Sequence, residues 1–332
     1  MSTCQDHITF WNGAKMPIVG LGTWLSTKEE IQTAVNAALE AGYRHIDTAY
    51  LYSNEDAIGE VLQQWITSGK VKREELFIVT KLPMIGNRSE HVERFLKKSL
   101  QNLRLDYVDL YLIHAPIGLI AKHDDDLFPM NADGFVVLDN NTDLVDLWKG
   151  MEKQVDAGLA KSIGLSNFNE EQIERIVKSA RIKPANLQVE LHAEFQQKSL
   201  RDFCHKHGIT IVAYAPLGSP GRNAFYASVG MAVPDLPDLI QNPVVVKIAE
   251  KYKKSSAQVL LRYLMQLGLA VIPKSVTPAR IHANFQVFDF NLSAADMTEL
   301  GGLDQGEKGR TFDLTTTLRG ADKHPENPFR NH

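Results

Sequence analysis

The chain has 332 residues, 44% of them hydrophobic and 23% charged, and its 36 Lys and Arg against 40 Asp and Glu give a net charge of −4. This mild acidity excludes the basic surface that nucleic acid or an anionic membrane attracts. The two cysteines, Cys4 and Cys204, exclude a disulfide framework and favour a reducing, cytoplasmic setting. Neither a signal peptide nor a segment long and apolar enough to span a bilayer is present, so no membrane partner is expected.

The predicted elements alternate between short apolar strands and amphipathic helices. A hairpin at about residues 7–17 turns at Asn12-Gly13. The apolar segment from Val19 predicts a strand, and Thr27-x-x-Glu30 is a capping box that starts a helix. The pairs that follow are "YRHID" with a helix from about Asn54, "LFIVTK" with one from about Ser89, "DYVDLYLIH" with one from about Asp143, "AKSIGLS" with one from Asn169, "ANLQVE" with one from Lys198, "TIVAYA" with one from about Asn242 and "LAVIPKS" with one from about Pro278.

Eight strand-and-helix units after a hairpin predict the fold class. Strands this apolar, each followed by a helix, indicate a parallel sheet covered by helices. Over this length, eight units favour a closed (β/α)8 TIM barrel, formed by residues 1–332 as a single domain. Long polar loops are expected at the C-terminal face, at 116–141, 218–241 and 306–332.

Polar residues end several of the predicted strands. In a (β/α)8 barrel the active site lies at the carboxyl ends of the strands. The polar residues at those ends are Asp47, Lys81, His114, Ser166, Asn167, Gln188, Glu190, Tyr214 and Lys274. Taken singly, such a residue is most often a cap or a solvated loop residue. Their convergence at one barrel mouth points to an active site.

Four of the residues near this mouth suggest acid catalysis. Lys81 beside Asp47 is expected to stay charged and to lower the pKa of Tyr52 from about 10 toward neutrality. Tyr52 could then act as a general acid, while neutral His114 could orient a carbonyl oxygen by a hydrogen bond. None of the four can donate a hydride, so a cofactor must supply it.

Several of these segments resemble the aldo-keto reductase family. The resemblance is carried by "GYRHIDTAYLYSNE", "LFIVTKL", "VDLYLIHAP", "AGLAKSIGLSNF", "IVAYAPLG" and "AVIPKSVTPARIHAN", and it runs from about His7 to beyond Leu303. It implies a (β/α)8 barrel and the NADPH-dependent reduction of aldehydes and ketones to alcohols, by a monomer. Within the family, the sequence resembles the insect branch that includes 3-dehydroecdysone reductase. This branch implies a 3-dehydroecdysteroid as one substrate, beside medium-chain and aromatic aldehydes.

The resemblance also assigns site residues. The implied catalytic residues are Asp47, Tyr52, Lys81 and His114, with Tyr52 as the proton donor. The implied NADPH-binding residues are Gly22, Thr23, Asp47, Ser166, Asn167, Gln188, Tyr214, Leu217, Lys274, Ser275, Arg280 and Asn284. The expected substrate-binding residues are Trp24, Tyr52, His114 and Phe128. Residues of the loop 116–141 could form a lid, and the sequence leaves open whether the loops 116–141 and 306–332 close over the substrate. Lys274, Ser275 and Arg280 match the grip on the adenosine 2′-phosphate, which suits Lys and Arg. Ala215 and Ala283 depart from the family pattern at two cofactor contacts.

Other readings remain open beside the enzyme. "GLGTWL" from Gly20 lacks the last glycine of a dinucleotide fingerprint, and "GLSNF" lacks the second glycine of a nucleophile elbow. The run His123 to Asp126 predicts a solvated acidic loop, so no metal site is expected. The alternative function is an NADPH-binding sensor or structural barrel without useful turnover. The presence of all four catalytic residues favours the enzyme.

Overall fold

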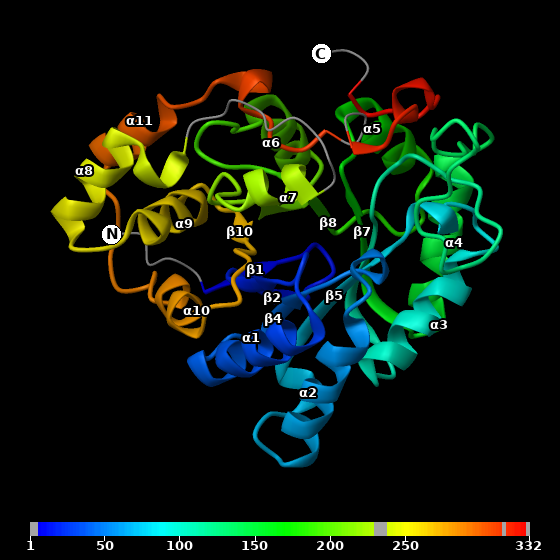
Figure 1. The fold of residues 1–332 in the computed structure, drawn as a ribbon, viewed down its shortest axis with the longest axis horizontal. Helices are drawn as coiled ribbons and strands as arrows, with labels where there is room; N and C mark the ends of the chain where they lie inside the picture. Colours follow the sequence, from blue (N-terminus) through cyan, green and yellow to red (C-terminus); the bar gives the residue numbers. More distant parts are fainter. Residues whose placement is uncertain (1–5, 229–237, 314–316, 330–332) are drawn as a thin grey trace.

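A barrel of eight parallel strands surrounded by helices forms the fold (Figure 1). The computed structural model describes residues 6–228, 238–313 and 317–329. The barrel strands are β3 (Gly20–Gly22), β4 (His45–Asp47), β5 (Phe77–Leu82), β6 (Val108–Ile113), β7 (Ala160–Ser166), β8 (Asn186–Glu190), β9 (Thr210–Tyr214) and β10 (Ala270–Val271). Each pairs in parallel with the next in chain order, which confirms the predicted barrel.

The first and last strands close the barrel through two isolated parallel bridges. These bridges join Val19 to Val271 and Gly22 to Lys274. Gly22 is required there, because a Cβ at this position would lie 2.7 Å from the backbone oxygen of Ile272. The closing contact therefore depends on a residue that the family resemblance assigns to cofactor binding.

Helices begin close to most of the predicted positions. They are α1 (Lys28–Ala41), α2 (Glu55–Thr67), α3 (Val92–Leu103), α4 (Leu144–Asp156), α5 (Glu170–Ser179), α6 (Lys198–Lys206), α7 (Arg222–Ser228), α8 (Pro243–Tyr252), α9 (Ser256–Gln266), α10 (Pro278–Phe285) and α11 (Ala294–Gly301). The Thr27 and Glu30 capping box is present at α1. The helix expected from about Ser89 begins only at Val92, because a turn closed by His91 N–H and the Arg88 carbonyl precedes it.

Three helices were not predicted. The segment 218–241, expected to be a loop, contains α7 and a 3₁₀ turn at Leu239–Gln241. Helix α8 ends at Tyr252, because the next residue, Lys253, has a left-handed backbone with φ of 54°. Helix α9 then begins behind a capping box of Ser255 and Gln258. That capping box is visible in the sequence and is the signal that would have separated α8 from α9. Helix α11 is likewise introduced by a capping box, at Ser293.

The predicted N-terminal hairpin consists of β1 (His7–Thr9) and β2 (Lys15–Pro17), paired antiparallel. Its contacts are with the amino-terminal ends of barrel strands. The Phe10 ring packs edge-on against Phe77 at 5.9 Å, and Asn12 donates to the Ser162 hydroxyl at 3.0 Å. The hairpin therefore covers the end of the barrel opposite the carboxyl ends of the strands.

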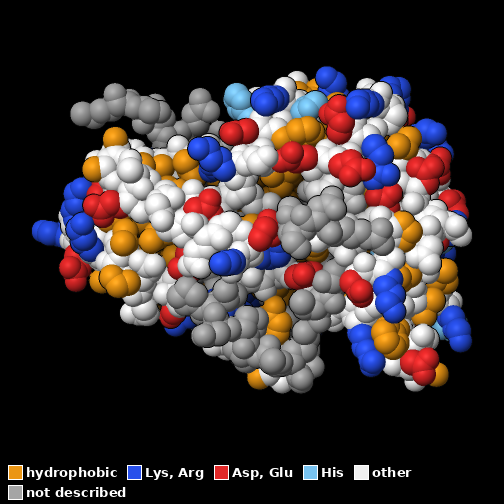
Figure 2. Space-filling view, turned by 90° about the horizontal axis from the view of Figure 1, so that it is seen from above, with side chains coloured by type: hydrophobic (Ala, Val, Ile, Leu, Met, Phe, Trp, Pro, Cys, Tyr) orange, Lys and Arg blue, Asp and Glu red, His pale blue; other side chains and the backbone are white. Residues whose placement is uncertain are grey.

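The surface in Figure 2 carries Lys and Arg side chains interspersed with Asp and Glu, and among the coloured side chains no one sign of charge forms a continuous field. Among the described residues, no helix is both long enough and apolar enough to cross a membrane.

Candidate active site

The four predicted catalytic residues lie together at the carboxyl ends of three neighbouring strands. Asp47 ends β4, Lys81 is the penultimate residue of β5, and His114 directly follows β6. Tyr52 comes from the 3₁₀ turn Tyr50–Tyr52, which follows β4. Adjacent parallel strands end at the same edge, so these side chains face one mouth.

Lys81 is the centre of this group. Its Nζ donates to Oδ1 of Asp47 at 2.6 Å, to the Thr48 carbonyl at 2.9 Å and to the Tyr52 hydroxyl at 3.4 Å. The side chains of Lys81 and Asp47 are 0% and 2% exposed, so this is a buried ion pair. The Tyr52 ring meets His114 edge-on, with 5.6 Å between ring centroids. The structure thus brings all four residues into contact.

The expected lowering of the Tyr52 pKa is wrong. Burial, and after it the negative charge of Asp47, raises the pKa of Tyr52 well above its usual value. Burial also lowers the pKa of Lys81, although Asp47 opposes this shift. The lysine charge is compensated by the carboxylate at 2.6 Å, so it does not outweigh the cost of burying a phenolate. Tyr52 therefore keeps its proton.

His114 is neutral, as expected. Burial, followed by the charge of Lys81, holds the pKa of His114 well below its usual value. Its Nδ1 is a buried atom without a hydrogen-bond partner among the described residues. A neutral imidazole can donate from one nitrogen only, so the tautomer decides which nitrogen can bond to a substrate.

Two residues that hold the Tyr52 turn were not predicted. Asn54 is buried, and its amide donates to the Thr23 carbonyl at 2.9 Å. The adjacent Glu55 is also buried and accepts from the Thr80 hydroxyl at 2.5 Å. Both lie within the "HIDTAYLYSNE" segment, so the turn is fixed to β3 and β5 by residues two and three positions after Tyr52. The sequence signal was the polar pair at the start of a helix.

Three of the four predicted nicotinamide residues are linked by side-chain hydrogen bonds. The Tyr214 hydroxyl donates to Oδ1 of Asn167 at 2.8 Å, and the Asn167 amide donates to the His114 carbonyl at 2.9 Å and the Ser166 hydroxyl at 3.2 Å. Gln188 instead donates to Oδ2 of Asp47 at 2.7 Å. These side chains connect β7, β8 and β9 to the catalytic group, and their binding of a nicotinamide stays a prediction.

Of the predicted phosphate residues, Lys274 lies at the contact that closes the barrel and Arg280 lies in α10. Lys274 donates to the Leu25 carbonyl at 3.0 Å, and Arg280 is exposed on α10. Burial lowers the pKa of Lys274, with Glu30 opposing. Asn284, near the end of α10, is buried. Two accessible cationic side chains on one short segment fit an anionic group such as a phosphate.

Aromatic residues line the predicted substrate mouth. The ring of Phe312 lies edge-on to Trp24 at 5.5 Å and to Tyr214 at 6.2 Å. Phe312 was not predicted individually, although the loop 306–332 that contains it was. Phe128 is 42% exposed on the loop 116–141. Its part in substrate binding stays a prediction, and so do the roles of Gly22, Thr23, Ser275 and Leu217.

Among residues 6–228, 238–313 and 317–329, no group of three or more His, Cys, Asp or Glu side chains is placed to hold a metal ion. In the acidic loop at His123 to Asp126, the Asp124 carboxylate pairs with Arg94 at 3.2 Å and Lys98 at 2.7 Å. Asp124 therefore fastens the loop to α3.

A barrel whose mouth holds a buried lysine between an aspartate and a protonated tyrosine is suited to an oxidoreductase that moves a proton with a hydride. The model of the aldo/keto reductase family matches residues 18–305, and the chain belongs to this family. The fold and family make it an oxidoreductase that uses a nicotinamide cofactor and acts on small carbonyl compounds.

Relatives and a solved structure match nearly the whole chain. Aldo-keto reductase family 1 member A1 from Gallus gallus is 46% identical over 99% of both chains. The protein of the same name from Homo sapiens is 45% identical, over 88% of this chain and 87% of its own. The structure of the aldose reductase from Schistosoma japonicum superposes with a TM-score of 0.88 at 46% identity, covering 99% of this chain and 100% of that one.

Proposed function

We propose that this protein reduces aldehydes and ketones to alcohols with NADPH, and that Tyr52 donates the proton. The observation that carries the proposal is the position of Lys81, whose Nζ lies 2.6 Å from Asp47 and 3.4 Å from the Tyr52 hydroxyl. NADPH, when bound, supplies the hydride. The protein residues supply the proton and hold the carbonyl group.

The roles of the four residues follow from their charges. Protonated Tyr52 gives its proton to the carbonyl oxygen as negative charge develops there. Lys81 stabilises the resulting phenolate, and Asp47 keeps Lys81 charged despite its burial. Neutral His114 donates a hydrogen bond that orients the carbonyl group. Lys81 and Asp47 are buried, whereas Tyr52 and His114 are partly exposed at the mouth, where a substrate can reach them.

The choice of NADPH over NADH rests on Lys274 and Arg280. Both side chains are exposed near the start of α10, where a 2′-phosphate could reach them. Lys274→Ala should raise the Kd for NADPH far more than the Kd for NADH. Equal losses for the two cofactors would contradict this part of the proposal.

The decisive experiment compares Tyr52→Phe with Tyr50→Phe. Both tyrosines lie in the same turn, but the Tyr50 hydroxyl points to the Asp124 carbonyl at 3.4 Å and not to Lys81. Tyr52→Phe should abolish NADPH oxidation with an aldehyde while NADPH still binds, and Tyr50→Phe should keep most of the activity. Activity in Tyr52→Phe would show that another group donates the proton.

The substrate panel contains an aromatic aldehyde, a medium-chain aldehyde, a simple ketone and a 3-keto steroid such as 3-dehydroecdysone. The aromatic mouth formed by Trp24, Phe312 and Tyr214 favours apolar carbonyl compounds. Turnover of none of them, with tight NADPH binding, would favour a sensor or structural barrel. We further propose a monomer in the cytoplasm, a setting in keeping with Cys204, which is buried and free.

A further inference from the structure

Glu190 is a buried carboxylate that the proposed reaction does not use. It ends β8 and is 1% exposed. One oxygen, Oε1, accepts from the Thr311 backbone N–H at 2.7 Å and from the Thr311 hydroxyl. The other, Oε2, accepts from the Phe312 backbone N–H at 2.9 Å. His192 Nε2 lies 3.1 Å from Oε1. Glu190, at the end of β8, thus holds Thr311 and Phe312, which follow it by 121 and 122 positions in the sequence.

Phe312, which Glu190 holds in this way, forms part of the substrate wall. Phe312 packs edge-on against Trp24 at 5.5 Å and against Tyr214 at 6.2 Å. Trp24 follows β3, and Tyr214 ends β9. Both are fixed by the barrel, whereas Phe312 comes from a segment outside it. The position of the Phe312 ring therefore depends on what fixes the backbone at Thr311 and Phe312.

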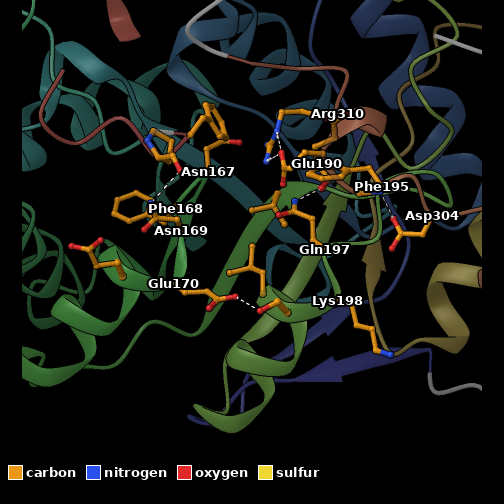
Figure 3. Close-up of a pocket in the computed structure, with 18 residues that line it drawn as sticks. Asn167, Phe168, Asn169, Glu170, Glu190, Phe195, Gln197, Lys198, Asp304 and Arg310 are labelled. Atoms are coloured by element: carbon orange, nitrogen blue, oxygen red, sulfur yellow. Dashed lines mark hydrogen bonds and ion pairs between the residues drawn. The ribbon is translucent and has the colours of Figure 1, made fainter. Parts of the chain in front are cut away.

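The segment before Phe312 borders an open cavity. Figure 3 shows Glu190 and Arg310 side by side on the wall of this cavity, whose volume is about 520 Å³. Arg310 lies over the rings of Phe195 at 4.5 Å and Phe329 at 4.4 Å. Part of the segment before Phe312 therefore borders open space and not packed side chains.

Further contacts hold neighbouring parts of the segment. Gln305 N–H donates to the Glu194 carbonyl at 2.9 Å, and the Tyr226 hydroxyl donates to the Thr311 carbonyl at 2.8 Å. Only Glu190, however, is shown to bond to the backbone N–H of Phe312 itself among the described residues. Hydrogen bonds to a charged group are also stronger than those between neutral groups.

We propose that Glu190 is a positioning residue for substrate selection: its carboxylate holds Thr311 and Phe312 so that the Phe312 ring completes an aromatic wall for the substrate. This inference rests on the proposed carbonyl reduction. The binding of aromatic aldehydes, which can pack against Phe312 and Trp24, depends on this wall. Short aliphatic aldehydes are too small to make the same contacts.

The test measures kcat and KM for benzaldehyde and propanal in Glu190→Gln. The glutamine keeps the size of the side chain but replaces one acceptor oxygen with a donor, so at least one of the bonds to Thr311 or Phe312 is lost. The KM for benzaldehyde should rise about tenfold. The KM for propanal and the Kd for NADPH should change less than twofold.

Three further variants separate positioning from a loss of folding. Glu171→Gln makes the same change at an exposed residue of the same cavity and should leave both KM values unchanged. Thr311→Val removes only the hydroxyl that bonds Glu190 and should shift the benzaldehyde KM in the same direction. Thr311→Ser keeps a hydroxyl and should restore the original value.

A double-mutant cycle with Phe312→Ala completes the test. If Glu190 acts through Phe312, adding Glu190→Gln to Phe312→Ala should cause little further change in the benzaldehyde KM. The inference would be overturned if the two substitutions had additive effects on the benzaldehyde KM. It would also be overturned if an active Glu190→Gln enzyme kept the wild-type ratio of the benzaldehyde KM to the propanal KM. Either result would leave the proposed function standing. A wild-type protein that reduces none of the carbonyl compounds would overturn the proposed function and the inference with it.

Discussion

Gln188 donates its side-chain amide to Oδ2 of Asp47 across the barrel interior, at 2.7 Å. Their strands, β8 and β4, are four places apart in the eight-stranded order. Lys81 occupies the other oxygen of the same carboxylate, at 2.6 Å. Asp47 is therefore held from two sides, by a cation on a neighbouring strand and by an amide from the opposite side.

This arrangement predicts an effect of Gln188→Leu on catalysis. The variant leaves one oxygen of a buried carboxylate without its donor, and a bond to a charged group contributes about 1.5–3 kcal/mol. The kcat of reduction should fall roughly tenfold or more. Gln101→Leu, at an exposed position, is the control. A normal kcat in Gln188→Leu, measured with saturating NADPH, would show that Lys81 alone positions Asp47.

The pKa shifts predict a flat pH profile for reduction. The pKa of His114 lies well below its ordinary value of about 6.5, so the imidazole stays neutral as the pH falls through that value. The pKa of Tyr52 lies well above its ordinary value of about 10, so the phenol stays protonated as the pH rises. The kcat should change little between about pH 6 and 9. An inflection near pH 6.5 that disappears in His114→Gln would refute this.

The hydrogen bond of Asn54 to Thr23 predicts that a substitution can destabilise the Tyr52 turn while the four catalytic residues stay unchanged. Asn54→Ala removes the bond to the Thr23 carbonyl and leaves that carbonyl unpaired in a buried site. The unfolding free energy should fall by about 1–3 kcal/mol. The kcat should fall further than the KM rises, because the substrate pocket keeps its walls. Denaturant unfolding and steady-state kinetics on the same sample separate the two effects.

The contacts of Asp296 predict that its substitution lowers the stability of the fold by an amount that depends on pH. Burial acts to raise its pKa, but hydrogen bonds from Lys251, Ser293 and Tyr252 together hold the pKa of Asp296 well below its usual value. A lowered folded-state pKa contributes stability that is complete above the unfolded value of about 3.9 and is lost gradually as the pH falls from there through the lowered folded-state pKa. Asp296→Asn also weakens the Ser293 capping box, which contributes roughly 1 kcal/mol.

Thermal unfolding of Asp296→Asn should therefore show a lower midpoint than the wild type at pH 7, and the difference should narrow as the pH falls below about 4. Asp289→Asn is the matched control, because the Asp289 pair with Lys254 leaves the carboxylate 65% exposed. That change should alter the midpoint little at either pH. An Asp296→Asn deficit that persists unchanged at low pH would contradict the assigned charge.

The fold could be predicted because its signals are local. The capping boxes at Thr27 and Asn169 and the apolar strands each fix an element from a few adjacent residues. The boundary between α8 and α9 was missed because the apolar pattern runs through it. Only the left-handed backbone at Lys253 and the capping box behind it divide the two helices.

The candidate site could be predicted in its composition but less well in its energetics. Strand ends supplied Asp47, Lys81 and His114 because the barrel brings all strand ends to one face. The pKa of Tyr52 could not be read in the same way, because it depends on how deeply the phenol is buried. Phe312 was missed because the bonds to Glu190 that place it span more than a hundred positions.

The seam between β3 and β10 joins parts of the chain that are distant in sequence. Lys274 and Leu25, which meet there, are 249 positions apart. Contacts between such distant residues form late in folding, since the entropy of closing the intervening chain must be overcome first. The ring of strands should thus be completed last at this seam. A dinucleotide bound by Lys274 would therefore stabilise the contact between β3 and β10 that closes the barrel.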